Sequence, residues 1–113
     1  MSWTIYHNPR CSTSRNVLQA LRDAGIAPTV IDYLKTPPDR ATLQRLADAT
    51  GLGVVGIVRA KEALYTELGL AGASDAQLLD AMQAHPVLIN RPIVVGPKGT
   101  RLCRPSETVR ELL

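Results

Sequence analysis

The stretch that decides the fold is Tyr6-His7-Asn8-Pro9-Arg10-Cys11-Ser12-Thr13-Ser14-Arg15-Asn16. It follows a short β-rich run at 3–6 and precedes apolar residues with helical spacing that end before Gly25. Cys11 is therefore expected at a turn from a strand to a helix, where the first helical N–H groups have no partner within the helix. The positive end of the helix dipole favours a thiolate there, so the sequence predicts that Cys11 is a nucleophile with a lowered pKa.

The residues around Cys11 favour a reactive thiol over a buried structural one. Its neighbours are proline, arginine, serine and threonine, which do not build an apolar pocket. Arg10 and Arg15 add positive charge, which stabilises a thiolate. His7 could tune the thiolate or accept a proton, or could equally be a strand-end histidine bonded to the backbone. Asn8 is expected in the turn, where it would also hold the loop.

Positions 14 and 17 separate this motif from dithiol redox sites and phosphatase loops, respectively. A dithiol site would need a second cysteine at position 14, but the residue is Ser14, so the motif is C-x-x-S. Ser14 could donate a hydrogen bond to the thiolate, yet it cannot resolve a disulfide, and turnover would therefore need an external thiol. A C-x5-R phosphate loop is excluded because Val17 stands at the arginine position and Arg15 is too close to Cys11.

The composition narrows the class of protein. A chain of 113 residues with 45% apolar and 20% charged residues supports one globular domain. No apolar run reaches the roughly 20 residues of a membrane helix and no secretion signal precedes the first strand, so a cytoplasmic protein without membrane contact is expected. A net charge of +3 with one Trp, three Tyr and no Phe argues against nucleic-acid binding. Cys11 and Cys103 lack metal-ligand and C-x-x-C spacing, so neither a metal site nor a disulfide is expected.

The patterns along the chain predict the order of its elements. A second strand is expected at 29–33, followed by helices at 39–50, 57–60, 62–68 and 74 to about 85. Short strands are expected at 87–89, 93–95 and 100–103, and a last helix from 105 to 113. A hydroxyl residue, Ser12 or Thr13, is expected to cap the first helix.

A βαβ unit followed by a ββα unit, with a cysteine at the first strand-to-helix turn, is the thioredoxin/glutaredoxin arrangement. The predicted fold is therefore an α/β mixed sheet flanked by helices. It forms a single domain over 1–113, with a helical insert at about 39–85 between the two units.

Arg91 gains meaning from this fold class, and strand alternation adds two further residues near the end of the chain. In thioredoxin-like folds the residue before a proline opposite the nucleophile lines the substrate site, and that proline is commonly cis. Arg91-Pro92 fits this place, so Arg91 is a candidate to bind an anion beside Cys11. Strand alternation puts Arg104 on the face opposite to Cys103, which is expected to be a small core residue rather than a resolving thiol.

The chain resembles the glutaredoxin-coupled arsenate reductase (ArsC) family. Residues 7–16 resemble its H-N-P-x-C-G-T-S-R-N signature, and residues 88–95 and 99–107 look like its C-terminal blocks. Glu67-Leu68-Gly69-Leu70, preceded by Val58-Arg59, also matches. One departure is Ser12, which stands where the family has glycine and would be strained if the backbone there needed a positive φ.

The resemblance implies the reduction of arsenate to arsenite with no bound cofactor. The Cys11 thiolate would attack arsenic while Arg59, Arg91 and Arg104 bind the oxyanion. Glutathione would then attack the adduct, and glutaredoxin would clear the resulting Cys11–glutathione disulfide. On local evidence alone Arg59 would be a surface arginine. Supporting roles at the site are expected for five more residues, His7, Asn8, Ser14, Arg15 and Pro92.

Two other functions stay open. One is a monothiol, glutathione-dependent oxidoreductase whose oxidant is not arsenate. The other is a regulator that binds RNA polymerase, like the Spx proteins of the same superfamily. The regulator is disfavoured because Spx proteins use a C-x-x-C switch at this turn, which Ser14 breaks.

Overall fold

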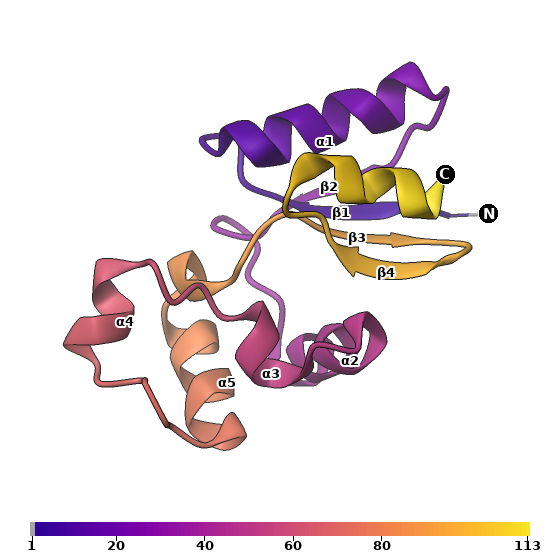
Figure 1. The fold of residues 1–113 in the computed structure, drawn as a ribbon. Helices are drawn as coiled ribbons and strands as arrows, with labels where there is room; N and C mark the ends of the chain where they lie inside the picture. Colours follow the sequence, from indigo (N-terminus) through magenta and orange to yellow (C-terminus); the bar gives the residue numbers. More distant parts are fainter. Residues whose placement is uncertain (1) are drawn as a thin grey trace. The chain divides into compact units, whose positions relative to one another are not determined.

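The computed structural model describes residues 2–113, and the chain divides into two compact units (Figure 1). One unit, called the sheet unit below, joins the N-terminal part up to Thr36 with Arg91–Leu113. The other, called the helical unit, is Pro37–Asn90. The helical unit interrupts the sheet unit in the chain, which is the predicted arrangement of a helical insert between βαβ and ββα.

The sheet unit contains a four-stranded mixed sheet in the order β2-β1-β3-β4. β1 pairs with β2 in parallel and with β3 antiparallel, and β3 and β4 form an antiparallel hairpin. This topology confirms the predicted thioredoxin-like class. The strands of the sheet are β1 (Thr4–His7), β2 (Thr29–Asp32), β3 (Ile93–Gly96) and β4 (Gly99–Leu102).

Helix α1 (Ser12–Asp23) connects β1 to β2 and buries its apolar face. It ends in a Schellman motif, in which Gly25 takes φ +79° and the N–H of Ile26 bonds to the carbonyl of Leu21 at 3.0 Å. The predicted hydroxyl cap at the other end is wrong. The N-cap residue is Cys11, and its side chain makes no capping hydrogen bond, which leaves the first N–H groups of α1 available to other acceptors.

One core lies between the sheet, α1 and the C-terminal 3-10 helix η2 (Ser106–Leu112), which Figure 1 shows on the same side of the sheet. The last helix is thus 3-10 rather than α, and Pro105 precedes it as its N-cap residue. Cys103 is fully buried in this core, which confirms its predicted place. Its buried partners are Ile5, Val17, Leu18, Leu21, Val94, Val109 and Leu112.

The helical unit contains four α-helices and one 3-10 helix. Asp39 caps α2 by accepting the N–H of Thr42 at 2.8 Å, as predicted. Ser74 and Gln77 form a capping box at the start of α5. The elements are α2 (Arg40–Thr50), α3 (Gly53–Ile57), α4 (Ala63–Glu67), α5 (Asp75–Ala84) and η1 (Pro86–Leu88).

Two predictions in the helical unit are wrong. The helix expected at 57–60 lies earlier, as α3, because Val54 and Ile57 share one buried face and burial outweighs the low helix propensity of the glycines. The strand expected at 87–89 is η1, whose first residue is Pro86. Only Ile89 pairs as a strand residue, in an isolated antiparallel bridge with Val58.

Within residues 2–113, no helix combines the length and the apolar character that crossing a membrane requires.

Candidate active site

Cys11 lies between β1 and α1, at the N-terminus of the helix. Its N–H donates to the carbonyl of Asn8 at 3.0 Å, and its own carbonyl accepts the N–H of Arg15 at 3.0 Å. The first bond closes the turn after β1, and the second is the first bond of the helix. The thiol is half-buried, so the sulfur is partly open to reactants and still close to the helix terminus.

The surroundings of Cys11 lower the pKa of its thiol. Burial raises this pKa, but the backbone N–H of Ser14 and the side chains of Arg91 and Arg104 favour the thiolate and together outweigh burial. The net pKa lies below its ordinary value of 9.0. The Ser14 N–H is one of the first-turn donors that have no acceptor within the helix, so its positive end favours negative charge on the sulfur. The arrangement therefore favours a thiolate.

Two arginines from the C-terminal part of the chain meet at this sulfur. Arg104 Nη1 lies 3.7 Å from Cys11 Sγ and donates to the backbone carbonyl of Arg91 at 3.1 Å. Each arginine precedes a proline in a cis peptide, Arg91-Pro92 and Arg104-Pro105. Two guanidinium groups beside a helix N-terminus form a place suited to a tetrahedral oxyanion, because both kinds of donor favour negative charge.

Ser14 takes part in the site through a different atom from the one predicted. Its side chain is fully buried, and its hydroxyl oxygen accepts the N–H of Asn8 at 3.0 Å and lies 2.6 Å from Nδ1 of His7. The hydroxyl therefore holds the turn after β1, whereas the backbone N–H of Ser14 is the group that lowers the pKa of Cys11. The expectation of a hydroxyl bond to the thiolate is corrected accordingly.

His7 is a buried histidine at the end of β1. Burial lowers its pKa, Asp32 raises it, Arg22 and Arg15 lower it further, and the net pKa lies below 6.5. The imidazole is therefore neutral at pH 7 and can accept the Ser14 hydroxyl proton at Nδ1. His7 is thus a hydrogen-bonded histidine at the end of a strand, which is one of the two roles left open by the sequence. Its partner is the side chain of Ser14 and not the backbone.

Asn8 and Arg15 both hold the loop before Cys11. Asn8 Oδ1 accepts the N–H of Arg10 at 2.9 Å, and Asn8 Nδ2 donates to the hydroxyl of Tyr33 at 3.1 Å. Arg15 Nη1 donates to the carbonyl of Pro9 at 2.9 Å. The sequence did not predict a role for Tyr33 in the site. Its position could have suggested one, because it follows β2 directly, β2 pairs in parallel with β1, and its hydroxyl can form hydrogen bonds.

Arg59 belongs to the helical unit and contacts two other residues of that unit. Its N–H donates to the carbonyl of Leu88 at 2.7 Å, and its Nε lies 3.6 Å from a carboxylate oxygen of Glu62. The side chain is only 20% exposed, so it is not the solvated surface arginine that its local sequence suggests.

Ser12, the departure from the family signature, is compatible with the backbone. It is the first residue of α1 and is exposed. No residue other than glycine has a positive φ within the described part of the chain, so the serine side chain carries no left-handed strain.

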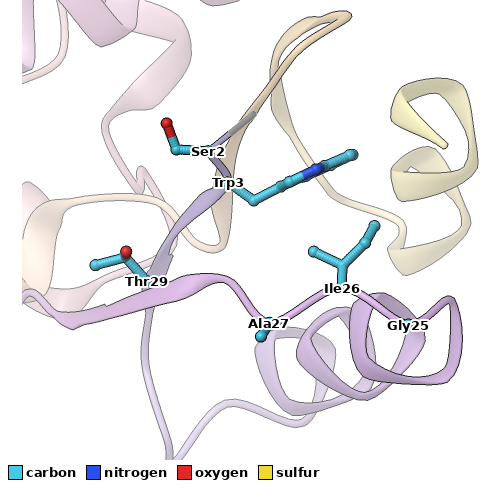
Figure 2. Close-up of a pocket in the computed structure, with 6 residues that line it drawn as sticks. All are labelled: Ser2, Trp3, Gly25, Ile26, Ala27 and Thr29. Carbon is cyan, nitrogen blue, oxygen red and sulfur yellow. The ribbon is translucent and has the colours of Figure 1, made fainter.

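An open pocket of about 300 Å³ lies apart from Cys11, at the other end of α1 (Figure 2). The 12 residues of the helix span about 18 Å between the two places. The pocket is lined by residues before β1, by the connection between α1 and β2, and by the first residue of β2: Ser2, Trp3, Gly25, Ile26, Ala27 and Thr29. Within residues 2–113, no three or more His, Cys, Asp or Glu side chains are grouped to share a metal ion.

A β2-β1-β3-β4 mixed sheet with a cysteine of lowered pKa beside two arginines, at the start of α1, defines a thioredoxin-like protein with a candidate thiol site. Residues 6–112 match the ArsC family, and the chain belongs to this family. It is 57% identical to an arsenate reductase of Rhizobium meliloti, over the whole chain and 82% of the relative. It is 55% identical to an arsenate reductase of Escherichia coli, over 97% of the chain and 79% of the relative. The solved structure of an arsenate reductase from Vibrio cholerae superposes with a TM-score of 0.94 at 50% identity, covering 100% of this chain and 98% of that one.

Proposed function

We propose that the protein is an arsenate reductase that uses glutathione and glutaredoxin as its external thiols. The observation that carries the proposal is the position of Arg104 and Arg91 at the sulfur of Cys11, a thiol with a lowered pKa. Relatives named arsenate reductase share more than half of the sequence across nearly the whole chain, which supports arsenate as the oxyanion.

The first step is the attack of the Cys11 thiolate on arsenic. An S–As bond forms, and one arsenate oxygen leaves as water after protonation. A glutathione thiolate then attacks the Cys11 sulfur, the S–As bond breaks, and its electron pair stays on arsenic, which becomes As(III). The products are arsenite and a Cys11–glutathione disulfide. A glutaredoxin thiolate attacks the glutathione sulfur of this disulfide, forms a glutaredoxin–glutathione disulfide and releases the Cys11 thiolate.

The arginines supply positive charge to the oxyanion during the attack. Arg104 and Arg91 serve this role in the sheet unit, and we propose Arg59 from the helical unit as a third ligand. A guanidinium group can donate two parallel hydrogen bonds to arsenate oxygens, which both binds and orients the anion. Charge that is fixed in place before the reaction stabilises the transition state without further reorganisation.

The need for an external thiol is supported by the second cysteine. Cys103 is buried in the core, and burial raises the pKa of its thiol to about 12, with a further increase from Glu111 and an opposing decrease from Arg101. Such a thiol is neither exposed nor ionised, so it is a poor resolving group. Since glutathione and glutaredoxin act in the reducing cytoplasm, we expect the protein to work there.

The proposal is tested by arsenate-dependent NADPH oxidation in the presence of glutathione, glutaredoxin and glutathione reductase. Turnover should require Cys11, so the Cys11→Ser variant should show only background. Thioredoxin with thioredoxin reductase should not replace the glutathione system. Equal rates for wild type and Cys11→Ser would overturn the proposal, and turnover with thioredoxin alone would overturn the glutathione dependence. Ready glutathionylation of Cys11 without arsenate turnover would instead favour an oxidoreductase with another oxidant.

A further inference from the structure

We propose that Tyr33 is a positioning residue for the Cys11 turn. Its hydroxyl fixes the carboxamide of Asn8, and Asn8 in turn sets the place of the Cys11 sulfur relative to the first N–H groups of α1. The inference rests on the thiolate chemistry of the proposed function, but it does not depend on which oxidant the thiolate attacks.

Asn8 links every part of the turn. Its backbone N–H donates to Ser14 Oγ at 3.0 Å, and its backbone carbonyl accepts the N–H of Cys11 at 3.0 Å. Its side-chain oxygen accepts the N–H of Arg10 at 2.9 Å. These three bonds reach the residue before the nucleophile, the nucleophile itself, and the residue whose N–H favours the thiolate. A shift of Asn8 would therefore move Cys11 and Ser14 relative to each other.

Tyr33 supplies the fourth contact of Asn8. The two residues follow β1 and β2 directly, and the parallel register that pairs His7 with Asp32 brings them to the same edge of the sheet. Asn8 Nδ2 donates to the Tyr33 hydroxyl at 3.1 Å, and the Tyr33 side chain is fully buried. The bond thus joins the turn that carries Cys11 to a residue that is fixed by packing.

The Arg10 N–H sets the orientation of the Asn8 carboxamide, and the Tyr33 hydroxyl supports this orientation by accepting from Nδ2. With Nδ2 directed at Tyr33, Oδ1 faces the N–H of Arg10 and accepts from it. A reversed carboxamide would place an N–H donor against the Arg10 N–H, which is unfavourable. Without the hydroxyl, the buried Nδ2 loses this acceptor and the preferred orientation loses part of its support.

The role of the hydroxyl can be separated from that of the ring. Tyr33→Phe keeps the volume of the ring and removes only the hydroxyl, so an effect on Cys11 cannot come from a cavity. Tyr65→Phe removes a hydroxyl from α4 in the helical unit and is the matched control.

The experiment is the rate of Cys11 alkylation by iodoacetamide as a function of pH, with the modified cysteine identified by mass spectrometry. In Tyr33→Phe the apparent pKa of Cys11 should rise, because the sulfur is held less well against the Ser14 N–H. Below this pKa the rate should fall by about 3- to 10-fold, the effect of losing one hydrogen bond. At high pH, where both proteins are fully ionised, the rates should agree within about twofold, and Tyr65→Phe should follow wild type throughout.

An unchanged pH profile in a Tyr33→Phe protein with native circular dichroism would overturn the proposal. The Asn8→Ala variant tests the same bond from its other end and should also raise the apparent pKa of Cys11, and adding Tyr33→Phe to it should have no further effect. If Tyr33→Phe fails to fold, Asn8→Ala alone decides: an unchanged profile overturns the proposal. Alkylation uses no arsenate, so a shifted profile without arsenate turnover would contradict the proposed function and leave the role of Tyr33 intact.

Discussion

The guanidinium group of Arg104 lies 3.7 Å from the sulfur of Cys11, although 93 positions separate the two residues in the chain. Arg104 Nη1 also bonds to the carbonyl of Arg91, which fixes the direction of the guanidinium group. The contact therefore joins a nucleophile near the start of the chain to a positive charge near its end, in a geometry that the backbone of Arg91 holds.

Arg104→Ala should lower kcat/KM for arsenate by about 10- to 100-fold, because it removes a charged donor from both the thiolate and the oxyanion. The coupled NADPH assay measures this loss. Arg110→Ala is the matched control, since Arg110 is an exposed arginine of η2, and it should behave like wild type. An Arg104→Ala enzyme with wild-type kcat/KM would show that this arginine does not bind the oxyanion.

Arg59→Ala should raise KM for arsenate by about 10-fold if Arg59 is the third oxyanion ligand. The pH profile of Cys11 alkylation should stay the same, because none of the groups that shift the pKa of Cys11 belongs to the helical unit. Arg45→Ala, an exposed position of α2, serves as the control. An unchanged KM in Arg59→Ala, measured beside that control, would remove Arg59 from the site.

Ser14→Ala should lower the free energy of unfolding by about 1–3 kcal/mol, because buried groups of His7 and Asn8 lose their shared partner. Urea denaturation measures this change. Ser12→Ala removes an exposed hydroxyl two residues earlier and should change the stability little. Equal stability of Ser14→Ala and Ser12→Ala would contradict the structural role assigned to the Ser14 hydroxyl.

The lowered pKa of Cys11 predicts a pH-dependent difference in stability between wild type and Cys11→Ser. The unfolded thiol titrates near 9.0 and the folded one below it, so between the two values the unfolded chain binds more protons. Wild type should therefore gain stability relative to Cys11→Ser as the pH rises from below the folded pKa toward 9.0, and lose this gain as the pH falls again.

Urea titrations of both proteins at several pH values measure the difference. The comparison cancels the contributions of Cys103 and His7, which are present in both proteins. A constant difference across this range would show that the thiolate is not favoured in the fold.

The sequence was sufficient for the class of fold and for the position of Cys11. Helix α1 could be predicted from nearby residues alone. Val17, Leu18 and Leu21 have the spacing of one buried helical face, and Gly25 supplies the left-handed residue that ends the helix. The strand predicted at 87–89 failed because three apolar residues fit a strand and a buried 3-10 turn equally well.

The contacts within the site could be predicted less well than the elements that carry them. The roles of the Ser14 hydroxyl and of Tyr33 depend on the directions of side chains that meet where β1 and β2 end. The spacing of residues in the sequence does not predict these directions. Arg91 could be proposed only through the fold class, because its own neighbours describe an ordinary loop.

The site is also divided in the order of synthesis. Cys11 and its turn emerge from the ribosome before β3, β4 and the two arginines that adjoin the sulfur. Until these strands join the sheet, the cysteine has neither arginine beside it and is a more ordinary, less acidic thiol. The reactivity of Cys11 is therefore a measure of whether β3 and β4 have joined the sheet.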